Sequence, residues 1–373
     1  MSVEVLTAPA ITRESAPPAT AIPHRKLIRT WLKPVSTRNT MLALALVAFD
    51  LVLFAALLAG TIWLRAPLLK LLCGVAEGVV IARLFILGHD ACHQSLTEHR
   101  GLNRVIGRIV FLASLTPYSL WEIGHNVVHH GYTNLKDFDM VWAPRTLAAY
   151  RALSPRRRWL ERVYRSGWAP WLYYFNEIWW KKMYFPNRTQ MPTRRRVFIA
   201  DGVLVTLAAA AWIALLVLAA STTGQSAGLL LLSGFALPLL LWNGLIGWVV
   251  YVHHTHPRIA WYADKPAWSA AQPFVSTTVH MVFKPHFGID FDALLHHILE
   301  HTAHHVDMCI PLYRLKRAQA ILEARMPGHI VRQAFSWRQY SDTARRCKLY
   351  DFEHGCWTDF DGKPTSIPLT PSS

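Results

Sequence analysis

The sequence predicts an all-α integral membrane protein in which four transmembrane helices carry a cytoplasmic, histidine-rich cap that binds two metal ions. Three observations predict this fold: four apolar stretches long enough to cross a bilayer, an uneven distribution of Lys and Arg, and three short histidine clusters. Of the 373 residues, 52% are hydrophobic and the mean hydropathy is positive. This composition excludes an ordinary soluble globular protein.

Each apolar stretch is long enough for a spanning helix, which needs about 20 residues. The stretches cover residues 41–63, 67–87, 197–220 and 227–252. Lys70, Glu77 and Arg83 interrupt the second, and Asp50 and Asp201 lie in the first and third. Charges inside a membrane are costly and usually face a partner or a cavity, so we expect one or the other for each of these five residues. The alternative is that a span is drawn one turn too long.

Basic residues predict the orientation, because loops rich in Lys and Arg stay on the cytoplasmic side. Such residues crowd positions 25–38 and 145–196, whereas the loop near Arg65 has one and residues 221–226 have none. Both termini, the central loop and the histidine clusters should therefore face the cytoplasm, as in a bacterial inner membrane. The net charge of +16 lies beside the spans, where it serves topology and headgroup contact, so we expect no nucleic-acid partner.

Three regions are expected along the chain: a basic, disordered tail over residues 1–38, a membrane domain over 39–325 and a cytoplasmic tail over 326–373. Residues 105–121, broken at Pro117, and 159–184, rich in Trp and Tyr, are expected to lie in the membrane interface. A partner-binding patch is the alternative for the second segment. A further helix is expected over 313–326, before Pro327-Gly328. The five cysteines form no CxxC pair and predict no disulfide framework.

The histidine clusters carry the chemistry. They contain His89 and His93, then His125, His129 and His130, and finally His301, His304 and His305. Positions three or four apart share one face of an α-helix, so each cluster should aim two or three imidazoles at one point. Imidazole is a common ligand of iron, copper and zinc, and eight are too many for one ion. The clusters therefore predict a site for two transition metals.

Two metals that share eight ligands would have about four each, so we expect a ninth ligand. The favoured residue is His254, at the end of the fourth span, with His253, His256, His296 and His297 as alternatives. Asp90 and Glu300 adjoin cluster histidines, so either carboxylate could orient an imidazole ring. A solvated charge at a helix end is the alternative explanation for both.

The clusters resemble the histidine boxes of the membrane fatty acid desaturase superfamily. The sequences HDACHQS, HNVVHHGYTN, DMVWAP, VHHTHP and HTAHHVDMCIPLY are similar in particular to acyl-lipid desaturases of the omega-6, or delta-12, type. The chain departs from the family at Cys92, where a small residue such as Gly is usual. It also departs at His297, where Asn is frequent, so His297 becomes a candidate contact to a water molecule beside the metals.

The resemblance implies two Fe ions, O2 as co-substrate and loss of two hydrogens from a fatty acyl chain of a membrane lipid or acyl thioester. No flavin, haem or iron–sulfur motif is visible, so electrons must come from outside. The family's donors are small acidic carriers, a ferredoxin or a cytochrome b-type protein with its reductase. Arg156–Arg158 and Arg194–Arg196 would suit such a donor, although topology and headgroup contact also explain them.

Two other functions stay open at this point. A histidine-box hydroxylase or ketolase that acts on lipids, alkanes or carotenoids would use the same metals. A membrane metal transporter would place its ligands near the middle of the bilayer, often on broken helices. The clusters lie beyond the ends of the predicted spans, which favours the enzyme.

Overall fold

Four long helices dominate the computed structural model, which describes residues 21–186, 195–285 and 289–370. They are α2 (Thr40–Trp63), α3 (Pro67–Cys92), α10 (Arg196–Thr223) and the continuous helix Ala227–His254, which consists of α11 (Ala227–Leu231), the π-helical turn η4 (Leu232–Ala236) and α12 (Leu237–His254). All four are long and apolar enough to cross a membrane. The predicted all-helical membrane fold is therefore confirmed, with each span close to its predicted bounds.

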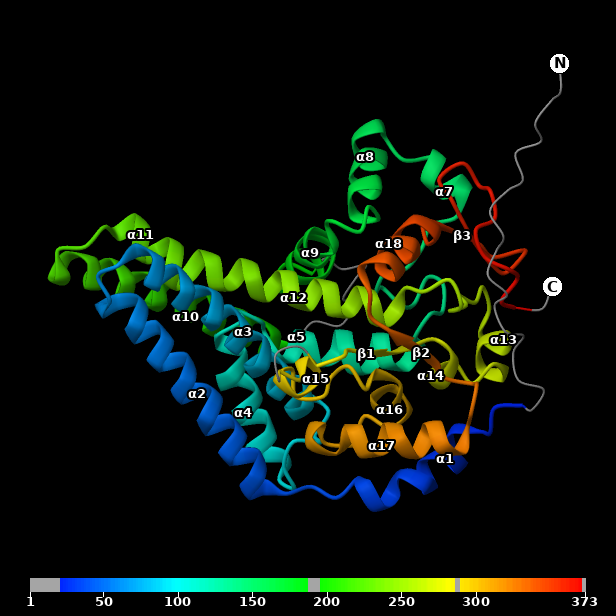
Figure 1. The fold of residues 1–373 in the computed structure, drawn as a ribbon, viewed down its shortest axis with the longest axis horizontal. Helices are drawn as coiled ribbons and strands as arrows, with labels where there is room; N and C mark the ends of the chain where they lie inside the picture. Colours follow the sequence, from blue (N-terminus) through cyan, green and yellow to red (C-terminus); the bar gives the residue numbers. More distant parts are fainter. Residues whose placement is uncertain (1–20, 187–194, 286–288, 371–373) are drawn as a thin grey trace.

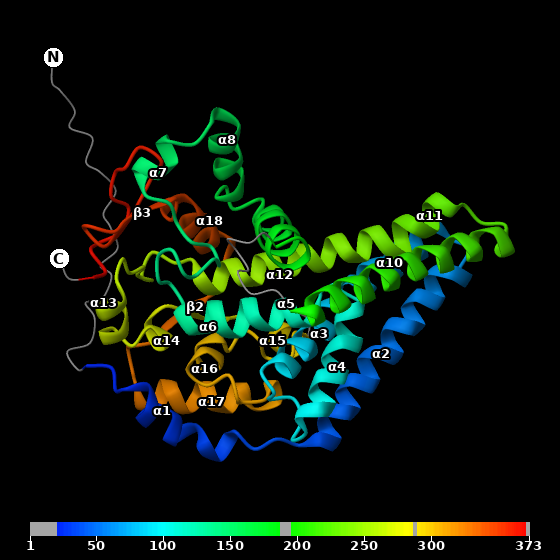
Figure 2. The same cartoon turned by 180° about the vertical axis from the view of Figure 1, so that it is seen from behind.

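The spans form two hairpins whose ends return to one side of the molecule (Figure 1). Local sequence sets their limits. The Asn39 side chain accepts a hydrogen bond from the Leu42 amide at the start of α2, and Pro67 occupies the first turn of α3. Gly224 ends α10 in the left-handed conformation, with φ 67°. Most of the shorter elements gather beyond the open ends of the hairpins, as both views show (Figures 1 and 2).

Three of the charged residues within the spans, Asp50, Arg83 and Asp201, form ion pairs in which the aspartate is buried. Asp50 Oδ1 lies 2.8 Å from Arg83 Nε, and Asp50 Oδ2 lies 2.7 Å from His296 Nε2. Asp201 Oδ1 lies 2.8 Å from Arg108 Nε. These contacts confirm the expectation that a charge inside the membrane faces a partner. The Asp50 contacts also connect α2 and α3 to the segment that precedes the third histidine cluster.

The other two charges in α3 differ from each other. Lys70 Nζ donates to the carbonyl of Thr61 at 2.5 Å and is buried. Glu77 is also buried, but neither carboxyl oxygen has a hydrogen-bond partner among the described residues. Lys70 thus has a partner, whereas Glu77 has none within the described part of the chain.

The cap consists of short helices and two small sheets. Strand β1 (Val279–Val282) pairs in parallel with β2 (Val331–Ala334), and β3 (Leu349–Asp351) pairs antiparallel with β4 (Cys356–Thr358). The remaining elements are α1 (Arg25–Leu32), η1 (Lys33–Val35), α4 (Arg100–Leu112), α5 (Tyr118–Glu122), η2 (Ile123–His129), α6 (His130–Tyr132), α7 (Leu147–Arg151), α8 (Pro155–Tyr164), α9 (Pro170–Tyr173), η3 (Tyr174–Tyr184), α13 (Lys265–Ala270), α14 (Pro273–Ser276), α15 (Phe291–Leu294), α16 (His301–Val306), α17 (Leu312–Arg325) and α18 (Trp337–Arg346).

The predicted interfacial segments are more broken than expected. Residues 105–121 contain the end of α4, a turn and the start of α5 after Pro117, while 159–184 contain α8, α9 and η3. Proline explains two of the breaks, because Pro117 precedes α5 and Pro170 opens α9. The helix expected over 313–326 corresponds to α17.

Both terminal regions differ from the tails that the composition suggested. Residues 1–20 lie outside the described part, but α1 buries Ile28 and Leu32 in the main core. At the other end, Tyr350 and Trp357 are fully buried, and Trp357 Nε1 donates to the carbonyl of Ile259 at 2.9 Å. Burial of large apolar side chains is the main favourable contribution to packing, and here it holds both segments on the cap.

Candidate metal centre

All three histidine clusters and the end of the fourth span converge inside the cap. His89 and His93 lie at the C-terminal end of α3, and His254 lies at the C-terminal end of α12. The second cluster lies on η2 and α6, and the third forms α16. These segments lie together beyond the open ends of the hairpins (Figure 2). Topology therefore brings together residues that are far apart in the chain.

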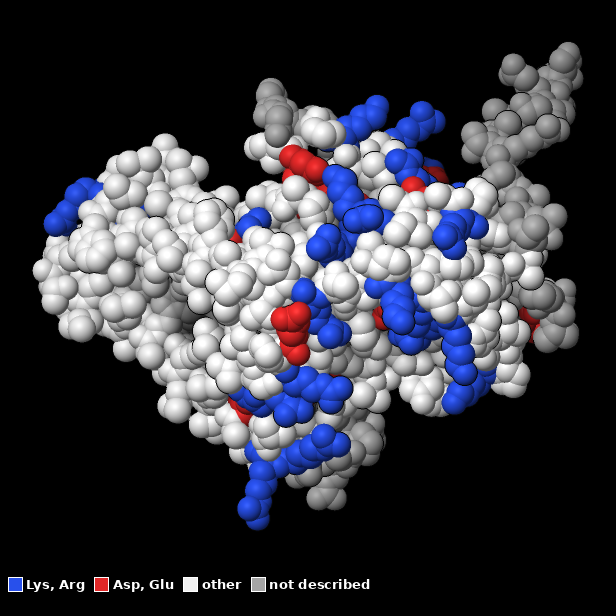
Figure 3. All heavy atoms as spheres, turned by 90° about the horizontal axis from the view of Figure 1, so that it is seen from below, with Lys and Arg blue, Asp and Glu red and all other residues white. Residues whose placement is uncertain are grey.

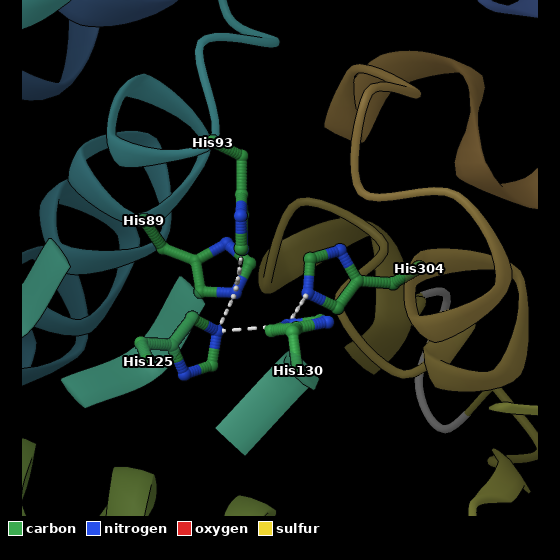
Figure 4. A group of neighbouring side chains, drawn as sticks. All are labelled: His89, His93, His125, His130 and His304. Carbon is green, nitrogen blue, oxygen red and sulfur yellow. Dashed lines mark hydrogen bonds between the residues drawn. The ribbon is translucent and has the colours of Figure 1, made fainter. Parts of the chain in front are cut away.

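The first group contains five histidines whose ligand atoms all lie within 4.8 Å of one another. Figure 4 shows the five rings, which come from α3, η2, α6 and α16 and point toward a common centre. His89 Nε2 lies 3.3 Å from His93 Nε2 and 3.0 Å from His125 Nε2. His130 Nε2 lies 3.1 Å from His125 Nε2 and 3.0 Å from His304 Nε2.

A second group of four fully buried histidines adjoins the first: His129, His254, His301 and His305. His254 Nε2 lies 2.8 Å from His301 Nε2 and 3.2 Å from His129 Nε2. His305 stacks on His130 of the first group, with ring centroids 4.2 Å apart. The structure thus places the nine predicted ligands, His254 included, in two adjacent groups.

A π-helix explains how the second cluster serves both groups. Residues Ile123–His129 form hydrogen bonds between positions five apart, so His125 and His130 lie on the same face. His129 then points toward His254 instead. In the third cluster, His301 and His305 join the second group and His304 joins the first. Each cluster thus aims two imidazoles at one group, as predicted, and the second and third clusters contribute their remaining histidine to the other group.

The nitrogen atoms are spaced as ligands of a common ion would be. Imidazole nitrogen binds zinc at about 2.0–2.1 Å, so two such ligands at right angles are separated by about 3 Å. The neighbouring Nε2–Nε2 pairs described above are separated by 2.8–3.3 Å. His305 Nε2 is buried and has no hydrogen-bond partner among the described residues. Both the spacing and this unpartnered atom fit a pair of bound transition metals.

Burial keeps the imidazoles in the form that binds metal. Loss of solvent, followed by the nearby histidines, lowers the pKa of His93, His125 and His130 well below the ordinary value. The same causes lower the pKa values of the third cluster, His301, His304 and His305. Neutral rings have a free lone pair at one nitrogen, which is what metal coordination requires.

Oxygen atoms behind the rings fix the orientation of three histidines. Asp139 Oδ1 lies 3.0 Å from His129 Nδ1, and Asp90 Oδ1 lies 3.3 Å from His89 Nδ1. Thr133 Oγ1 lies 3.3 Å from His305 Nδ1. Such contacts fix the tautomer and the direction of a ligand ring. Asp139 was missed from the sequence, although it begins the DMVWAP segment and an acidic residue shortly after a histidine cluster is a usable signal.

The other residues considered from the sequence have different neighbours. Glu300 Oε2 lies 2.8 Å from His280 Nε2 rather than against a cluster histidine. His297 Nδ1 lies 2.6 Å from Asp292 Oδ2, and His256 Nε2 lies 3.3 Å from Gln333 Oε1. His296 contacts Asp50, as described above. None of the alternative ninth ligands lies in either group of histidines within the described chain.

His253 and His280 form a layer behind the second group. His253 stacks on His301, with ring centroids 4.0 Å apart, and is fully buried. His280 lies on β1 between Glu300 and Glu323. Burial opposes protonation of His280, but the hydrogen bonds and charges of these two carboxylates outweigh it and raise its pKa. The two carboxylates therefore favour the protonated form of His280, which lies outside both groups of histidines.

A narrow apolar cavity of about 70 Å³ opens beside the histidines. His89, His125, His129, His254 and His301 line one side of it. Apolar side chains line the rest, among them Phe85, Trp121, Met140, Tyr174, Ile178, Met183, Ile246, Val249 and Ile298. This mostly apolar wall suits a hydrocarbon chain.

Comparison with known proteins identifies this arrangement. The fatty acid desaturase family model matches residues 61–337, which include all nine histidines. The chain belongs to the fatty acid desaturase family. It is therefore an oxidoreductase of the desaturase class, as the histidine clusters predicted.

Three curated relatives are similar over most of this desaturase. An sn-1 oleoyl-lipid 12-desaturase of Synechocystis sp. is 29% identical over 74% of this chain and 75% of its own. A second sn-1 oleoyl-lipid 12-desaturase, from Picosynechococcus sp., is 30% identical over 74% of this chain and 76% of its own. An sn-1 acyl-lipid omega-3 desaturase (ferredoxin) of Nostoc sp. is 28% identical over 71% of this chain and 69% of its own.

Proposed function

We propose that this desaturase introduces a double bond into a fatty acyl chain of a membrane lipid, with delta-12 regiochemistry. Two of its relatives are named oleoyl-lipid 12-desaturases. The observation that carries the proposal is the contact between the two histidine groups and the apolar cavity, because it puts a metal site beside space for a hydrocarbon chain. The catalytic unit spans residues 39–325 and is completed by α1 and the C-terminal segment.

The nine histidines are the proposed ligands of two Fe ions, five around one and four around the other. Iron suits imidazole ligands and changes oxidation state, which zinc does not. Bound iron supplies the oxygen chemistry by which –CH2–CH2– with O2, two electrons and two protons becomes –CH=CH– and two water molecules. Asp139, Asp90 and Thr133 hold the ligand rings in place.

The protein's own part is to position the acyl chain and exclude water. Trp121 stacks on His125, with ring centroids 4.1 Å apart, and forms a wall of the cavity. Phe85 and Phe111 pack against Trp121 from behind. Aromatic packing of this kind fixes the ring plane, so that the chain lies in one place relative to the metals.

The proposed setting is a bacterial inner membrane, with the four spans in the bilayer and the termini and metal centre on the cytoplasmic side. The argument is the distribution of basic residues, since the described loops on the side of the cap carry most of the Lys and Arg. At the opposite end of the hairpins, the turn between α2 and α3 carries Arg65, whose guanidinium donates to the carbonyl of Thr223 in the other hairpin.

The proposed electron donor is a small acidic carrier such as a ferredoxin, in line with the name of the Nostoc relative, an acyl-lipid omega-3 desaturase (ferredoxin). Figure 3 shows Lys and Arg side chains across the face formed by α1 and α17. This basic face includes Lys26, Arg29, Lys33, Lys316, Arg317 and Arg325. It lies next to the metal site, because Arg25 donates to the carbonyl of His305 at 2.9 Å. Of the arginines considered from the sequence, Arg194 lies outside the described residues.

The test is expression in a bacterial host that lacks polyunsaturated lipids, followed by mass spectrometry of its fatty acids. We expect oleate to lose two further hydrogens at carbons 12 and 13, and His130→Ala to abolish the product. A variant of the exposed His99, His99→Ala, should match wild type. A hydroxylated product would favour the hydroxylase instead, and no new product in the presence of a reduced donor would overturn the proposal.

A further inference from the structure

A second cavity, polar and larger than the first, lies on the other side of Met140. Its volume is about 530 Å³. Lys136, Asp139, Arg145, Glu161, Glu177 and Lys182 supply most of its charged lining, and Tyr173, Trp261 and Phe352 supply aromatic walls. Met140 lines both cavities. We call this second space the polar chamber.

The π-helix η3 separates the two cavities and presents different residues to each. Tyr174, Ile178 and Met183 line the apolar cavity, whereas Glu177 and Lys182 line the polar chamber. Neighbouring residues of one helix thus face a hydrocarbon space and a polar space. A ligand that occupied both would have an apolar chain joined to a polar end, which is the constitution of an acyl lipid.

The carboxylates of the chamber are already engaged. Asp139 contacts His129 and accepts from the amides of Asn134 and Val141. Glu161 accepts from Arg165 at 2.9 Å and from Arg145 at 3.2 Å. Glu177 accepts from Lys181 at 2.6 Å and from the Tyr164 hydroxyl at 3.0 Å. Asp137 is the exception, and it is exposed at the rim.

Two lysines are left as free donors. Within the described chain, no hydrogen bond or ion pair engages the amine of Lys182 or that of Lys136, although Lys136 Nζ lies 5.1 Å from the centre of the Phe352 ring. Burial lowers the pKa of Lys182 to about 8, and the charges of Asp139 and Glu177 only partly offset this. A mostly buried ammonium group that lacks a partner gains most from a ligand oxygen.

We propose that the polar chamber holds the ester-linked polar end of a glycerolipid substrate, with Lys182 and Lys136 donating to its carbonyl and headgroup oxygens. The acyl chain passes Met140 into the apolar cavity beside the histidines. This inference rests on the proposed function and specifies its substrate class: an acyl chain on a glycerolipid rather than on a thioester carrier. Lys182 and Lys136 are then residues that determine affinity and lipid class rather than chemistry.

The chain offers a matched control. Lys181 is the neighbour of Lys182 on the same helix, but it bonds to Glu177 and does not line the chamber. The comparison is therefore Lys182→Met with Lys181→Met, and Lys136→Met provides an independent second variant. Bound iron per chain and thermal unfolding should be the same in all three variants as in wild type, because none of these residues touches a histidine of the metal centre.

The experiment uses the purified full chain in vesicles with a reduced donor and three oleoyl substrates: phosphatidylglycerol, a galactolipid and the coenzyme A thioester. We expect Lys182→Met to raise the apparent KM for the glycerolipids about tenfold, the usual size of one lost charge-assisted hydrogen bond, with kcat and double-bond position unchanged. Lys182→Arg should restore part of the affinity. If the apparent KM rises for both glycerolipids, the Lys182 amine binds the ester oxygens. If it rises for phosphatidylglycerol alone, the amine binds the phosphate.

The outcomes separate this inference from the function on which it rests. If the Lys182 and Lys136 variants have the KM of Lys181→Met while all form the double bond, the chamber does not bind the polar end and the proposed function stands. A rise in KM confined to the thioester would also overturn the inference. A wild-type protein that forms no double bond from any of the three substrates would overturn the proposed function and the inference with it.

Discussion

His129 and His130 are adjacent in the chain, yet they face different groups of the metal centre. His130 Nε2 lies 3.1 Å from His125 Nε2, whereas His129 Nε2 lies 3.2 Å from His254 Nε2. The same division recurs at His304 and His305. Because neighbouring residues on short helices serve both groups, a displacement of either helix would disturb both groups of histidines together.

Loss of any one clustered histidine should therefore abolish turnover. Replacing His130 or His304 with Ala should remove more iron than the single ion whose ligand is lost, because the helices that hold both groups are shared. The measurements are iron per chain and oxygen consumption with a reduced donor. Near-full activity in three or more of the eight single alanine variants of the clustered histidines would contradict the two-metal site.

His254→Ala should lower iron content and activity strongly. The reference is His256→Ala, which removes a buried ring that contacts Gln333 and belongs to neither group. Burial also lowers the pKa of His256, to about 4, so both variants remove a neutral imidazole. Equal, small effects on iron binding would exclude His254 as a ligand.

Asp139→Asn should weaken iron binding about 10–100-fold, the usual effect of removing a carboxylate behind a ligand imidazole. The amide keeps the size of the side chain but removes the charge that holds His129 Nδ1–H. Asp361→Asn is the control, since Asp361 is exposed and lies far along the chain from the three histidine clusters. The measurement is the iron retained per chain as the chelator concentration is raised. Identical curves for the two variants would contradict a role of Asp139 in holding the ring of His129.

The double variant Lys26→Glu/Arg317→Glu should raise the donor's apparent KM and flatten its salt dependence. Both residues are exposed on the basic face of α1 and α17, and opposite charges speed encounter until salt screens them. Arg156→Glu on α8 changes charge elsewhere and should have a smaller effect. If Arg156→Glu has the larger effect at low salt, the donor docks on the α8 side instead.

Tags inserted at the N-terminus, near Arg157 and at the C-terminus should all report a cytoplasmic location. A tag in the turn between α10 and α11 should report the opposite side. The reason is the excess of basic residues on the side of the cap. Protease protection in sealed vesicles measures this, and an external tag near Arg157 would refute the orientation.

Much of this fold could be predicted from the sequence because its signals are local. A run of about 20 apolar residues defines a span, and the predicted limits differ from those of the structure by only a few residues. The histidines could be found in the same way, since regular spacing marks a helical face. His254 could be included because a further ligand was needed where the fourth span ends.

The rest depends on contacts between distant segments. The sequence around His125 does not distinguish a π-helix from an α-helix, so the division of the second cluster could not be predicted. Glu300 adjoins His301 in the sequence and could therefore be expected to orient its ring. In the structure its carboxylate contacts His280 instead. The polar chamber joins the loop after the second cluster to η3 and the C-terminal segment, and no spacing rule links these three.

The bonds from Arg25 to α16 have a consequence for how the protein is made. Its guanidinium donates to the carbonyls of Val306 and His305, which follow it by 281 and 280 residues. Contacts this distant form late, because the intervening chain must first be synthesised and inserted. During synthesis α1 is made long before its partner α16. The contact between them can form only after the third histidine cluster has been made, so truncation into Arg25 would remove a late contact that holds the helix of His305 in place.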